Sequence, residues 1–218
     1  MAGLFFSGGL SQTLGIYELN LQKLLLENLG PGSVFYDVGA NVGYFSLLAS
    51  RLVGQEGAVY AFEPFPPNVE KIEELVRRNR AWNIKVFSLA LWKMTGTQKL
   101  HFGRNSATPT LVARTKGQFL EVSTTTLDEF VKDNDKPTLI KIDVEGAELG
   151  VLDGGAGLLA CNLGPTLIIE VHSEKNESLL RSSLQKLGYT LSDIGHPRAR
   201  QRPYPAHRVA RKQIEEYR

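Results

Sequence analysis

A glycine turn and a later carboxylate are the residues of this chain best suited to bind a ligand. Gly39 and Gly43 bracket the turn directly after an apolar stretch, and Glu63 ends the next apolar stretch. In α/β proteins such glycines let a ligand approach the backbone, and the downstream carboxylate binds ribose hydroxyls. The pattern therefore predicts a nucleoside site. The alternative is an ordinary strand–helix turn whose glycines serve packing alone, and the presence of Glu63 counts against it.

The residues around the turn favour one nucleoside over another. A dinucleotide site has a third glycine near position 44, but Tyr44 and Phe45 stand there. Asn41 tolerates a positive φ better than most residues and can hydrogen-bond a ligand. Asp37, before the turn, suits a ligand that carries an ammonium group. These features favour S-adenosylmethionine over NAD.

Acidic residues and a histidine gather at the ends of two later apolar stretches. Asp143 and Glu145 follow one, while Glu170 and His172 end the next, two residues apart and so on one face of a strand. Three interpretations are open. His172 or a carboxylate takes a proton from an acceptor hydroxyl, or Asp143, Glu170 and His172 hold a divalent metal. In the third, Asp143 caps a helix and His172 bonds a loop. Their joint position favours acid–base catalysis, and metal ranks lower because no dense ligand motif is present.

Alternating strands and helices must bring these residues together. Apolar stretches predict strands at 34–37, 58–62, 84–89, 138–143, 166–171 and 189–194. Helical periodicity, with start and stop signals, predicts helices at 17–29, 43–52, 68–80, 126–132, 147–152 and 178–187. Short extended pieces at 98–102 and 119–123 bracket a polar insert at 103–118, and 209–216 is either a helix or a strand. The alternation implies a mostly parallel sheet covered by helices on both faces, with ligands at the carboxyl ends of its strands.

The composition is that of one α/β domain. The chain has 218 residues and is 42% hydrophobic, which suffices for a single core. Its one cysteine, Cys161, rules out an internal disulfide, fits a reducing compartment and is expected to be a small buried residue. The first lysine is Lys23, so the apolar N-terminus makes a poor signal peptide. No apolar run approaches the roughly 18 residues of a spanning helix. We therefore expect a soluble, cytoplasmic protein.

Positive charge is concentrated at the C-terminal end. The net charge is +2, but seven Arg or Lys residues against two Glu lie within 196–218. Such a segment can bind phosphates, RNA or an anionic membrane, although a solvated terminus is favoured because no aromatic residues interleave the charges as in RNA-binding segments. Nucleic acid is not the expected partner. The predicted organisation is one domain over 1–195, with a helical lead-in over about 1–30, and a basic tail over 196–218 that can complete the last strand.

Several motifs together resemble the FkbM-type S-adenosylmethionine-dependent methyltransferases. The two specific ones are DVGANVGYF, starting at Asp37, and KIDVEGAE, starting at Lys141. Further matching pieces are Tyr17-Glu18, Phe62-Glu63-Pro64, Ala90, 125–128, 151–154, 169–172 and 187–189. The resemblance runs from about residue 17 to 189 and does not cover the tail.

This resemblance implies a Rossmann-like, seven-stranded methyltransferase sheet that is mostly parallel with an antiparallel last strand. It also implies methyl transfer from S-adenosylmethionine, leaving S-adenosylhomocysteine, to a hydroxyl of a small molecule such as a sugar or polyketide. The cofactor carries the activated methyl, so the protein aligns the acceptor oxygen and excludes water. His172 is the favoured base, since an imidazole titrates near ~6.5, and Asp143 or Glu145 orients it or replaces it.

The resemblance further implies a role for individual residues. Glu63 binds the ribose, the glycine turn lines the methionine end, residues 88–90 lie near the adenine, and the insert 103–118 forms part of the acceptor pocket. Asp143 lies near the methyl donor, while Glu145, Glu170 and His172 face the acceptor. The full set of expected cofactor-binding residues is Glu18, Asp37, Gly39, Ala40, Asn41, Gly43, Tyr44, Phe45, Glu63, Pro64, Ser88, Leu89, Ala90 and Asp143.

Four rival functions stay open. The tail is the only support for RNA methylation, and a divalent metal at Asp143, Glu170 and His172 would make a metal-assisted O-methyltransferase. A non-catalytic S-adenosylmethionine-binding protein would use Glu63 without turnover. An NAD-dependent oxidoreductase is disfavoured because no catalytic Tyr/Lys pair is evident. Neither the acceptor nor the oligomeric state is predicted.

Overall fold

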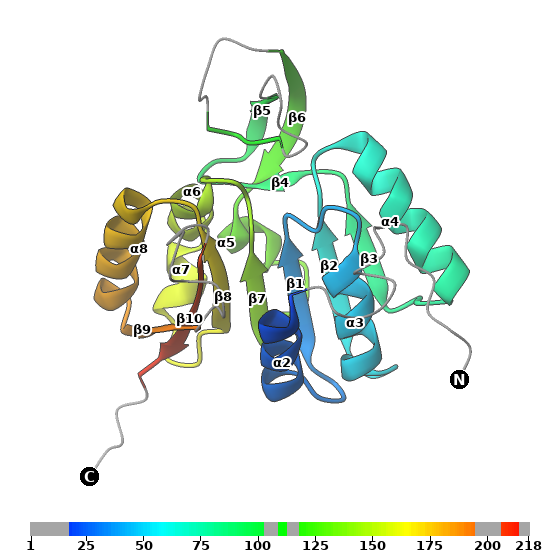
Figure 1. Ribbon diagram of the computed structural model, residues 1–218, viewed down its shortest axis with the longest axis horizontal. Coiled ribbons are helices and arrows are strands. Elements are labelled where there is room, and N and C mark those ends of the chain that lie inside the picture. Colours follow the sequence, from blue (N-terminus) through cyan, green and yellow to red (C-terminus); the bar gives the residue numbers. More distant parts are fainter. Residues whose placement is uncertain (1–17, 103–108, 113–117, 195–205, 214–218) are drawn as a thin grey trace.

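The computed structural model is built around one seven-stranded sheet, with a smaller sheet above one of its edges (Figure 1). It describes residues 18–102, 109–112, 118–194 and 206–213. The order of the main sheet is β3-β2-β1-β7-β8-β10-β9, and that of the small sheet is β4-β6-β5. The strands of the main sheet are β1 (Val34–Val38), β2 (Ala58–Phe62), β3 (Ile84–Phe87), β7 (Leu139–Ile142), β8 (Thr166–Val171), β9 (Tyr189–Asp193) and β10 (Ala206–Lys212). Those of the small sheet are β4 (Ala90–Leu91), β5 (Gly96–His101) and β6 (Phe119–Thr125).

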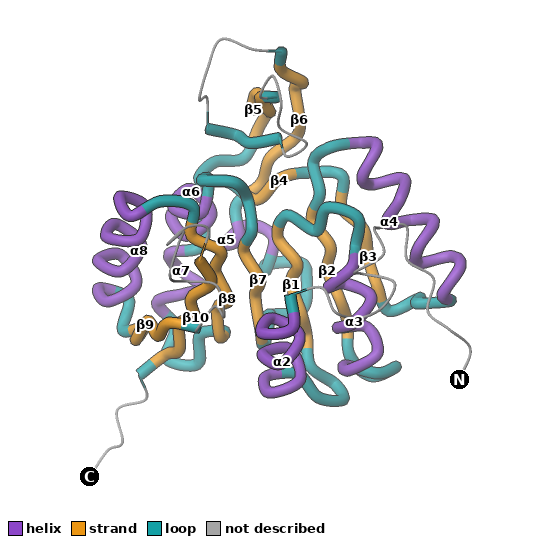
Figure 2. The backbone as a smooth tube through the Cα atoms, in the orientation of Figure 1, coloured by secondary structure: helices purple, strands orange, loops and turns teal. Residues whose placement is uncertain are grey.

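Helices cover both faces of the main sheet (Figure 2). One face packs against α2 (Leu19–Asn28), α3 (Tyr44–Val53) and α4 (Pro66–Asn79). The other packs against α5 (Leu127–Phe130), α6 (Glu148–Asp153), α7 (Ala156–Ala160) and α8 (Glu174–Lys186). Neighbouring strand residues alternate between the two cores, so that Phe35 belongs to the first and Tyr36 to the second. Strands buried on both faces explain why the apolar runs of the sequence are continuous rather than alternating.

Strand directions agree with the expected sheet. β1 pairs in parallel with β2 and β7, β2 with β3, and β7 with β8. β10 pairs antiparallel with both β8 and β9, so it is the one strand of this sheet that runs against the others. The prediction of a mostly parallel, seven-stranded sheet with an antiparallel last strand is confirmed.

The segment 206–212 completes the main sheet as a strand, the alternative that the sequence analysis kept open beside the favoured solvated terminus. These residues form β10, which lies between β8 and β9, and its Val209 and Ala210 are buried. Two sheet neighbours, rather than local sequence preference, decide that this segment is a strand. Residues 196–205 and 214–218 lie outside the described part of the chain.

Other boundaries differ locally from those expected. α8 begins at Glu174 because the hydroxyl of Ser173 accepts the N–H of Asn176 and caps it. The short helix α7 was not predicted, and it ends before Cys161, which is exposed rather than buried. Tyr17, at the start of the expected first helix, is outside the described residues. Within the described ranges no helix is both long and apolar enough to cross a membrane.

The strand order identifies where a ligand should bind. The chain proceeds from β1 to β2 and β3 on one side, and then returns to place β7 and β8 on the other side of β1. Ligands of open α/β sheets bind outside the carboxyl ends of the strands at such a reversal. The loops after β1, β2 and β7 meet there, below the small sheet in Figure 1.

Candidate active site

The turn after β1 is held against the loop after β7. Gly39, Asn41 and Gly43 all have positive φ, at 77°, 52° and 81°. A Cβ on Gly39 would lie 1.9 Å from the carbonyl oxygen of Asp143, so the two backbones are in contact there. Only glycine combines this φ with this approach. The sequence analysis expected these glycines to admit a ligand, and the contact of Gly39 with Asp143 is a packing requirement, the alternative that it disfavoured.

Glu63 connects the end of β2 to the same turn. Its Oε2 accepts the N–H of Asn41 at 2.8 Å and its Oε1 accepts the N–H of Phe65 at 2.9 Å. The residue is only 6% exposed. Burial, offset in part by these two hydrogen bonds and by one from Asn68, raises the pKa of Glu63 to about 7. Its carboxylate therefore titrates near neutral pH.

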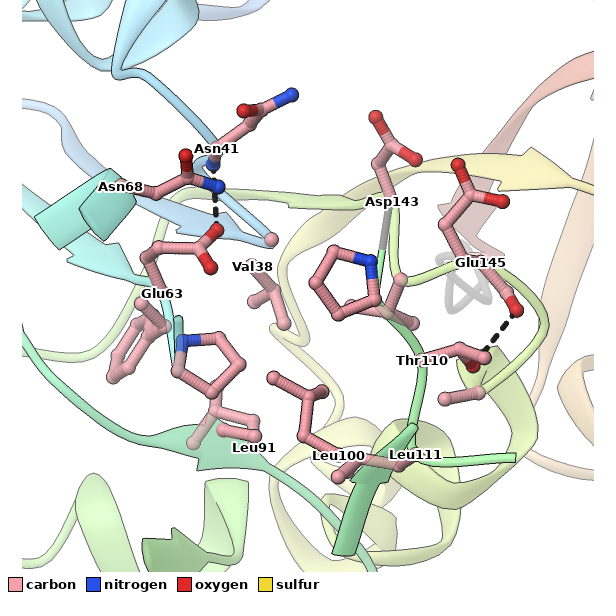
Figure 3. A pocket seen from close by; sticks show the side chains of 17 residues that line it. Val38, Asn41, Glu63, Asn68, Leu91, Leu100, Thr110, Leu111, Asp143 and Glu145 are labelled. Atoms are coloured by element: carbon pink, nitrogen blue, oxygen red, sulfur yellow. Dashed lines mark hydrogen bonds between the residues drawn. The ribbon is translucent and has the colours of Figure 1, made fainter. Parts of the chain in front are cut away.

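A pocket opens between Glu63 and the loop after β7 (Figure 3). Its empty volume is about 730 Å³, counting the part open to solvent. Glu63 and Asn68 lie on one side, Asp143 and Glu145 on the other, and Leu91 and two further leucines lie along the lower edge of the view. The lining residues are Val38, Gly39, Asn41, Phe62, Glu63, Pro64, Asn68, Ala90, Leu91, Leu100, Pro109, Thr110, Leu111, Asp143, Val144, Glu145 and Ala147.

The pocket contains about half of the residues expected to bind a cofactor. Those that line it are Gly39, Asn41, Glu63, Pro64, Ala90 and Asp143. Those that do not are Glu18, Asp37, Ala40, Gly43, Tyr44, Phe45, Ser88 and Leu89. Of the second group, Ala40 and Gly43 build the turn, and Ser88 and Leu89 build the bend between β3 and β4.

Asp37 lies within the core rather than at the pocket surface. It is fully buried, and its Oδ2 accepts the hydroxyl of Ser46 at 2.6 Å. The ammonium of Lys141 lies 3.4 Å from its Oδ1 and 3.3 Å from Oδ2 of Asp143. Burial alone would lower the pKa of Lys141, but Asp143 and Asp37 hold it above its usual value. Lys141, which the sequence analysis did not single out as a site residue, therefore links the buried Asp37 to the pocket residue Asp143.

The ends of β7 and β8 bring the predicted catalytic residues together. One ligating atom each from Asp143, Glu170 and His172 lie within 4.8 Å of one another. The carboxyl groups of Asp143 and Glu170 therefore interact electrostatically. Burial, followed by the charge of Asp143, raises the pKa of Glu170 to about 9, so it carries a proton at neutral pH. Burial would also raise the pKa of Asp143, but Lys141 and the interaction with Glu170 lower it.

His172 lies between three carboxylates. Its Nδ1 is 2.9 Å from Oε1 of Glu148 and its Nε2 is 3.4 Å from Oε2 of Glu145. Burial would lower the pKa of His172, but the hydrogen bond to Glu148 and the charges of Glu148, Glu145 and Asp143 raise it. Neither His172 nor Glu170 lines the pocket, whereas Glu145, which contacts His172, does.

A divalent metal at Asp143, Glu170 and His172 would compete with the Lys141 ammonium, which already lies 3.3 Å from Asp143. The three residues have the spacing for coordination, but their charges suit proton transfer better.

The remaining predicted residues connect the edges of this cluster. Glu18 precedes α2 at the N-cap position with a φ of 47°, and its Oε2 lies 3.4 Å from Nε2 of His207 on β10. That nitrogen is 3.9 Å from Oε2 of Glu170. The hydroxyl of Tyr44 accepts a hydrogen bond from Gln22 at 3.0 Å, which fixes α2 against α3. His207 was missed because its place depends on β10 lying beside β8.

Part of the insert reaches the pocket as expected. Pro109, Thr110 and Leu111 line it, and the Thr110 hydroxyl donates to the carbonyl of Glu145 at 3.0 Å. Residues 103–108 and 113–117 of the insert are outside the described ranges. The hydrogen bond from Thr110 thus holds the loop that carries Glu145 against the pocket.

Comparisons with known proteins agree with this geometry. Residues 37–191 match the model of the methyltransferase FkbM domain. The hexuronic acid methyltransferase AglP of Haloferax volcanii is 30% identical over 159 residues, which are 72% of this chain and 63% of that protein. The chain thus spans less than two thirds of that relative's length.

Solved structures share the fold at low identity. The methyltransferase FkbM of Methylobacillus flagellatus has a TM-score of 0.61 at 17% identity, over 94% of this chain and 56% of that one. A precorrin-6y C5,15-methyltransferase of Geobacter metallireducens has 0.61 at 16%, over 95% and 94%. Aeropyrum pernix fibrillarin, solved with natively bound S-adenosyl-L-methionine, has 0.52 at 13%, over 87% and 72%. These likenesses support the sheet architecture.

Proposed function

Because the chain belongs to the FkbM methyltransferase family, we propose that it moves a methyl group from S-adenosylmethionine to a hydroxyl of a small, sugar-like molecule. One observation carries the proposal. Glu63 faces Asp143 and Glu145 across a single pocket at the reversal of strand order. A ribose-binding carboxylate and a group of proton acceptors therefore lie on opposite sides of the same space.

The cofactor would lie across the pocket from Glu63 to Asp143. The Glu63 carboxylate, fixed by two backbone N–H groups, keeps lone pairs for the ribose hydroxyls. Pro64, Ala90 and Leu91 offer an apolar surface for the adenine ring of the cofactor. Asp143, whose pKa is lowered, offers an anion for the ammonium of the methionine moiety. The bound cofactor supplies the activated methyl group.

The protein's own residues would position the acceptor and remove its proton. We assign the base to His172, with Glu145 between it and the pocket. With S-adenosylmethionine bound, the acceptor oxygen would take its methyl group and leave S-adenosylhomocysteine. The hydroxyl proton would pass through Glu145, which lines the pocket, to Nε2 of His172, which does not. Glu170 keeps its proton and holds Asp143 in place.

A carbohydrate is the acceptor class to test first. The relative AglP is a hexuronic acid methyltransferase. Both polar residues, among them Asn68, Thr110 and Glu145, and leucines line the pocket, which suits a molecule with both hydroxyls and apolar ring faces.

RNA as acceptor finds less support than the basic tail suggested. Within 206–213, Arg208 is paired with Glu177 at 2.9 Å, and the Lys212 ammonium donates to the carbonyls of Leu159 and Leu187. The side chains of Arg208 and Lys212 are therefore engaged in contacts within the folded domain. We accordingly propose one domain that includes β10.

Calorimetric titration with S-adenosylhomocysteine and, separately, NAD tests the cofactor on wild type and Glu63→Ala. Tight binding of S-adenosylhomocysteine that the variant loses supports the proposal, whereas NAD binding alone overturns it. Transfer of labelled methyl to a panel of hexuronic acids and hexoses then tests the acceptor. His172→Ala should bind cofactor but lose turnover, and full turnover would refute the assignment of the base.

A further inference from the structure

Glu148 is a buried carboxylate that the proposed reaction has not yet used. It is fully buried at the first position of α6. Its Oε1 accepts the N–H of Gly146 at 2.8 Å and lies 2.9 Å from Nδ1 of His172. The amide of Asn176, on α8, donates to its Oε2 at 3.3 Å. A favourable charge at the start of α6 would not by itself require a fully buried carboxylate.

The contact with Glu148 determines which nitrogen of His172 is free to act. A neutral imidazole carries one N–H, and a carboxylate can only accept. A carboxylate oxygen faces each ring nitrogen, but the contact of Nδ1 with Glu148 is the shorter, at 2.9 Å against 3.4 Å between Nε2 and Glu145. The proton of the neutral ring is therefore assigned to Nδ1, which leaves the lone pair on Nε2. Nε2 is the nitrogen that faces Glu145, the neighbour that lines the pocket.

The same carboxylate also fixes the turn that presents Glu145. Glu145 and Gly146 have φ values of 52° and 97°, and the Thr110 hydroxyl and the Asn176 amide already hold the carbonyls of this sharp turn. The N–H of Gly146 is bonded to Glu148, so one side chain sets both the imidazole and its pocket-side neighbour.

We propose that Glu148 is the positioning residue of the base, holding His172 as the Nδ1–H tautomer with Nε2 directed at the acceptor side. The inference rests on the proposed methyl transfer. When the acceptor hydroxyl proton reaches Nε2, the ring becomes a cation with a proton on each nitrogen, and the Glu148 carboxylate stabilises that charge. The methyl–sulfur bond breaks as the oxygen–methyl bond forms, so no other reagent is needed.

The carboxylates that face His172 determine in which direction its pKa changes when Glu148 is substituted. Glu148 on α6, Glu145 in the preceding loop and Asp143 at the end of β7 all favour its protonated form. Glu148→Gln keeps the shape and one acceptor oxygen but removes a charge at 2.9 Å. The variant should therefore lower the pKa of His172 and make it a weaker base.

Nitrogen NMR of the histidine rings, without substrate, tests the arrangement directly. A His172→Gln spectrum assigns the signal among the four histidines. In wild type the neutral ring should be the Nδ1–H tautomer, and an Nε2–H tautomer would overturn the proposal. In Glu148→Gln the pKa of His172 should fall by about one unit, a tenfold change in its protonation equilibrium.

A matched control separates positioning from mere stability. Asp128 is another structural carboxylate, which accepts the N–H groups of Gly157 and Leu158 away from His172. Asp128→Asn should lower thermal stability and leave the His172 titration unchanged. If Glu148→Gln also leaves it unchanged, the proposal is wrong.

Kinetics connects the NMR result to the reaction. Glu148→Gln should move the acidic limb of the kcat profile to lower pH and reduce kcat at least tenfold, with the KM for cofactor unchanged. Glu148→Asp, which retains the charge, should restore the position of the limb. An unmoved limb in Glu148→Gln counts against positioning. If wild type methylates nothing, the proposed function fails, while the NMR experiment still decides the tautomer.

Discussion

A Cβ on Gly39 would lie 1.9 Å from the carbonyl oxygen of Asp143, which places the turn after β1 in direct contact with the loop after β7. This contact joins the two halves of the pocket through backbone alone. A side chain at position 39 would separate Glu63 from Asp143 as well as strain the turn.

Gly39→Ala should therefore lower the free energy of unfolding by more than the positive φ of residue 39 alone explains. Gly32 provides a matched control, because its φ is 81° but a Cβ there meets nothing within 4 Å. We expect Gly32→Ala to cost about 1–2 kcal/mol for the left-handed backbone. Gly39→Ala should cost at least about 4 kcal/mol, because the clash adds to that strain. Urea unfolding measures both, and equal costs would contradict the contact.

The affinity for S-adenosylhomocysteine should depend on pH through Glu63. Because the pKa of Glu63 is raised to about 7, its carboxylate is mostly protonated at lower pH and loses an acceptor for the ribose. We expect the Kd at pH 6 to be about tenfold higher than at pH 8. The same shift has the opposite sign for folding, since the stability that Glu63 contributes is present below pH ~4.5 and lost as pH rises through about 7. Calorimetry on Glu63→Gln, which cannot titrate, should show no such pH dependence of binding.

Lys141→Met should be strongly destabilising. The change leaves Asp37 buried without its ion pair, and breaking a buried pair typically costs about 3–5 kcal/mol. Asp37→Asn in the same chain should recover part of that loss, because no unpaired charge then remains. Lys23→Met, at an exposed lysine 3.7 Å from Glu27, should change stability by less than about 0.5 kcal/mol. A double-mutant cycle of wild type, Asp37→Asn, Lys141→Met and the double variant would measure the coupling energy between the two side chains. A coupling energy of zero would refute a stabilising ion pair.

Substitutions in β10 should distinguish a sheet strand from a solvated tail. Val209 is 2% exposed, so Val209→Asp should cost about 3 kcal/mol or more. The exposed Arg211→Ser should be within about 1 kcal/mol of wild type. If both variants unfold at the same denaturant concentration, β10 does not belong to the folded domain.

The elements with strong local signals were predictable from the sequence. Strand 58–62 was predicted with the bounds that β2 has, since an apolar run between turn signals fixes a buried strand. The glycine turn and Glu63 were found for a similar reason, because backbone approach and a carboxylate at a strand end are both local properties.

What could not be predicted depends on distant parts of the chain. The sequence left 209–216 open between helix and strand, and pairing with β8 and β9 decides that β10 is a strand. Glu148 reads as a helix-start residue, and its contact with His172 arises only because β7 and β8 are neighbours. Lys141 was not predicted as a site residue. A lysine inside an apolar strand that is buried on both faces needs a carboxylate partner, and this requirement would have marked it.

The place of β10 also has a consequence for how the chain reaches its folded state during synthesis. Among the described residues β9 pairs in the main sheet only with β10, and β8 keeps one edge open until residues 206–212 arrive. As the chain leaves the ribosome, five strands can assemble while the backbone groups at that edge of β8 stay unpaired. We expect the site beside Glu170 to form only when His207 has left the ribosome and β10 has paired with β8.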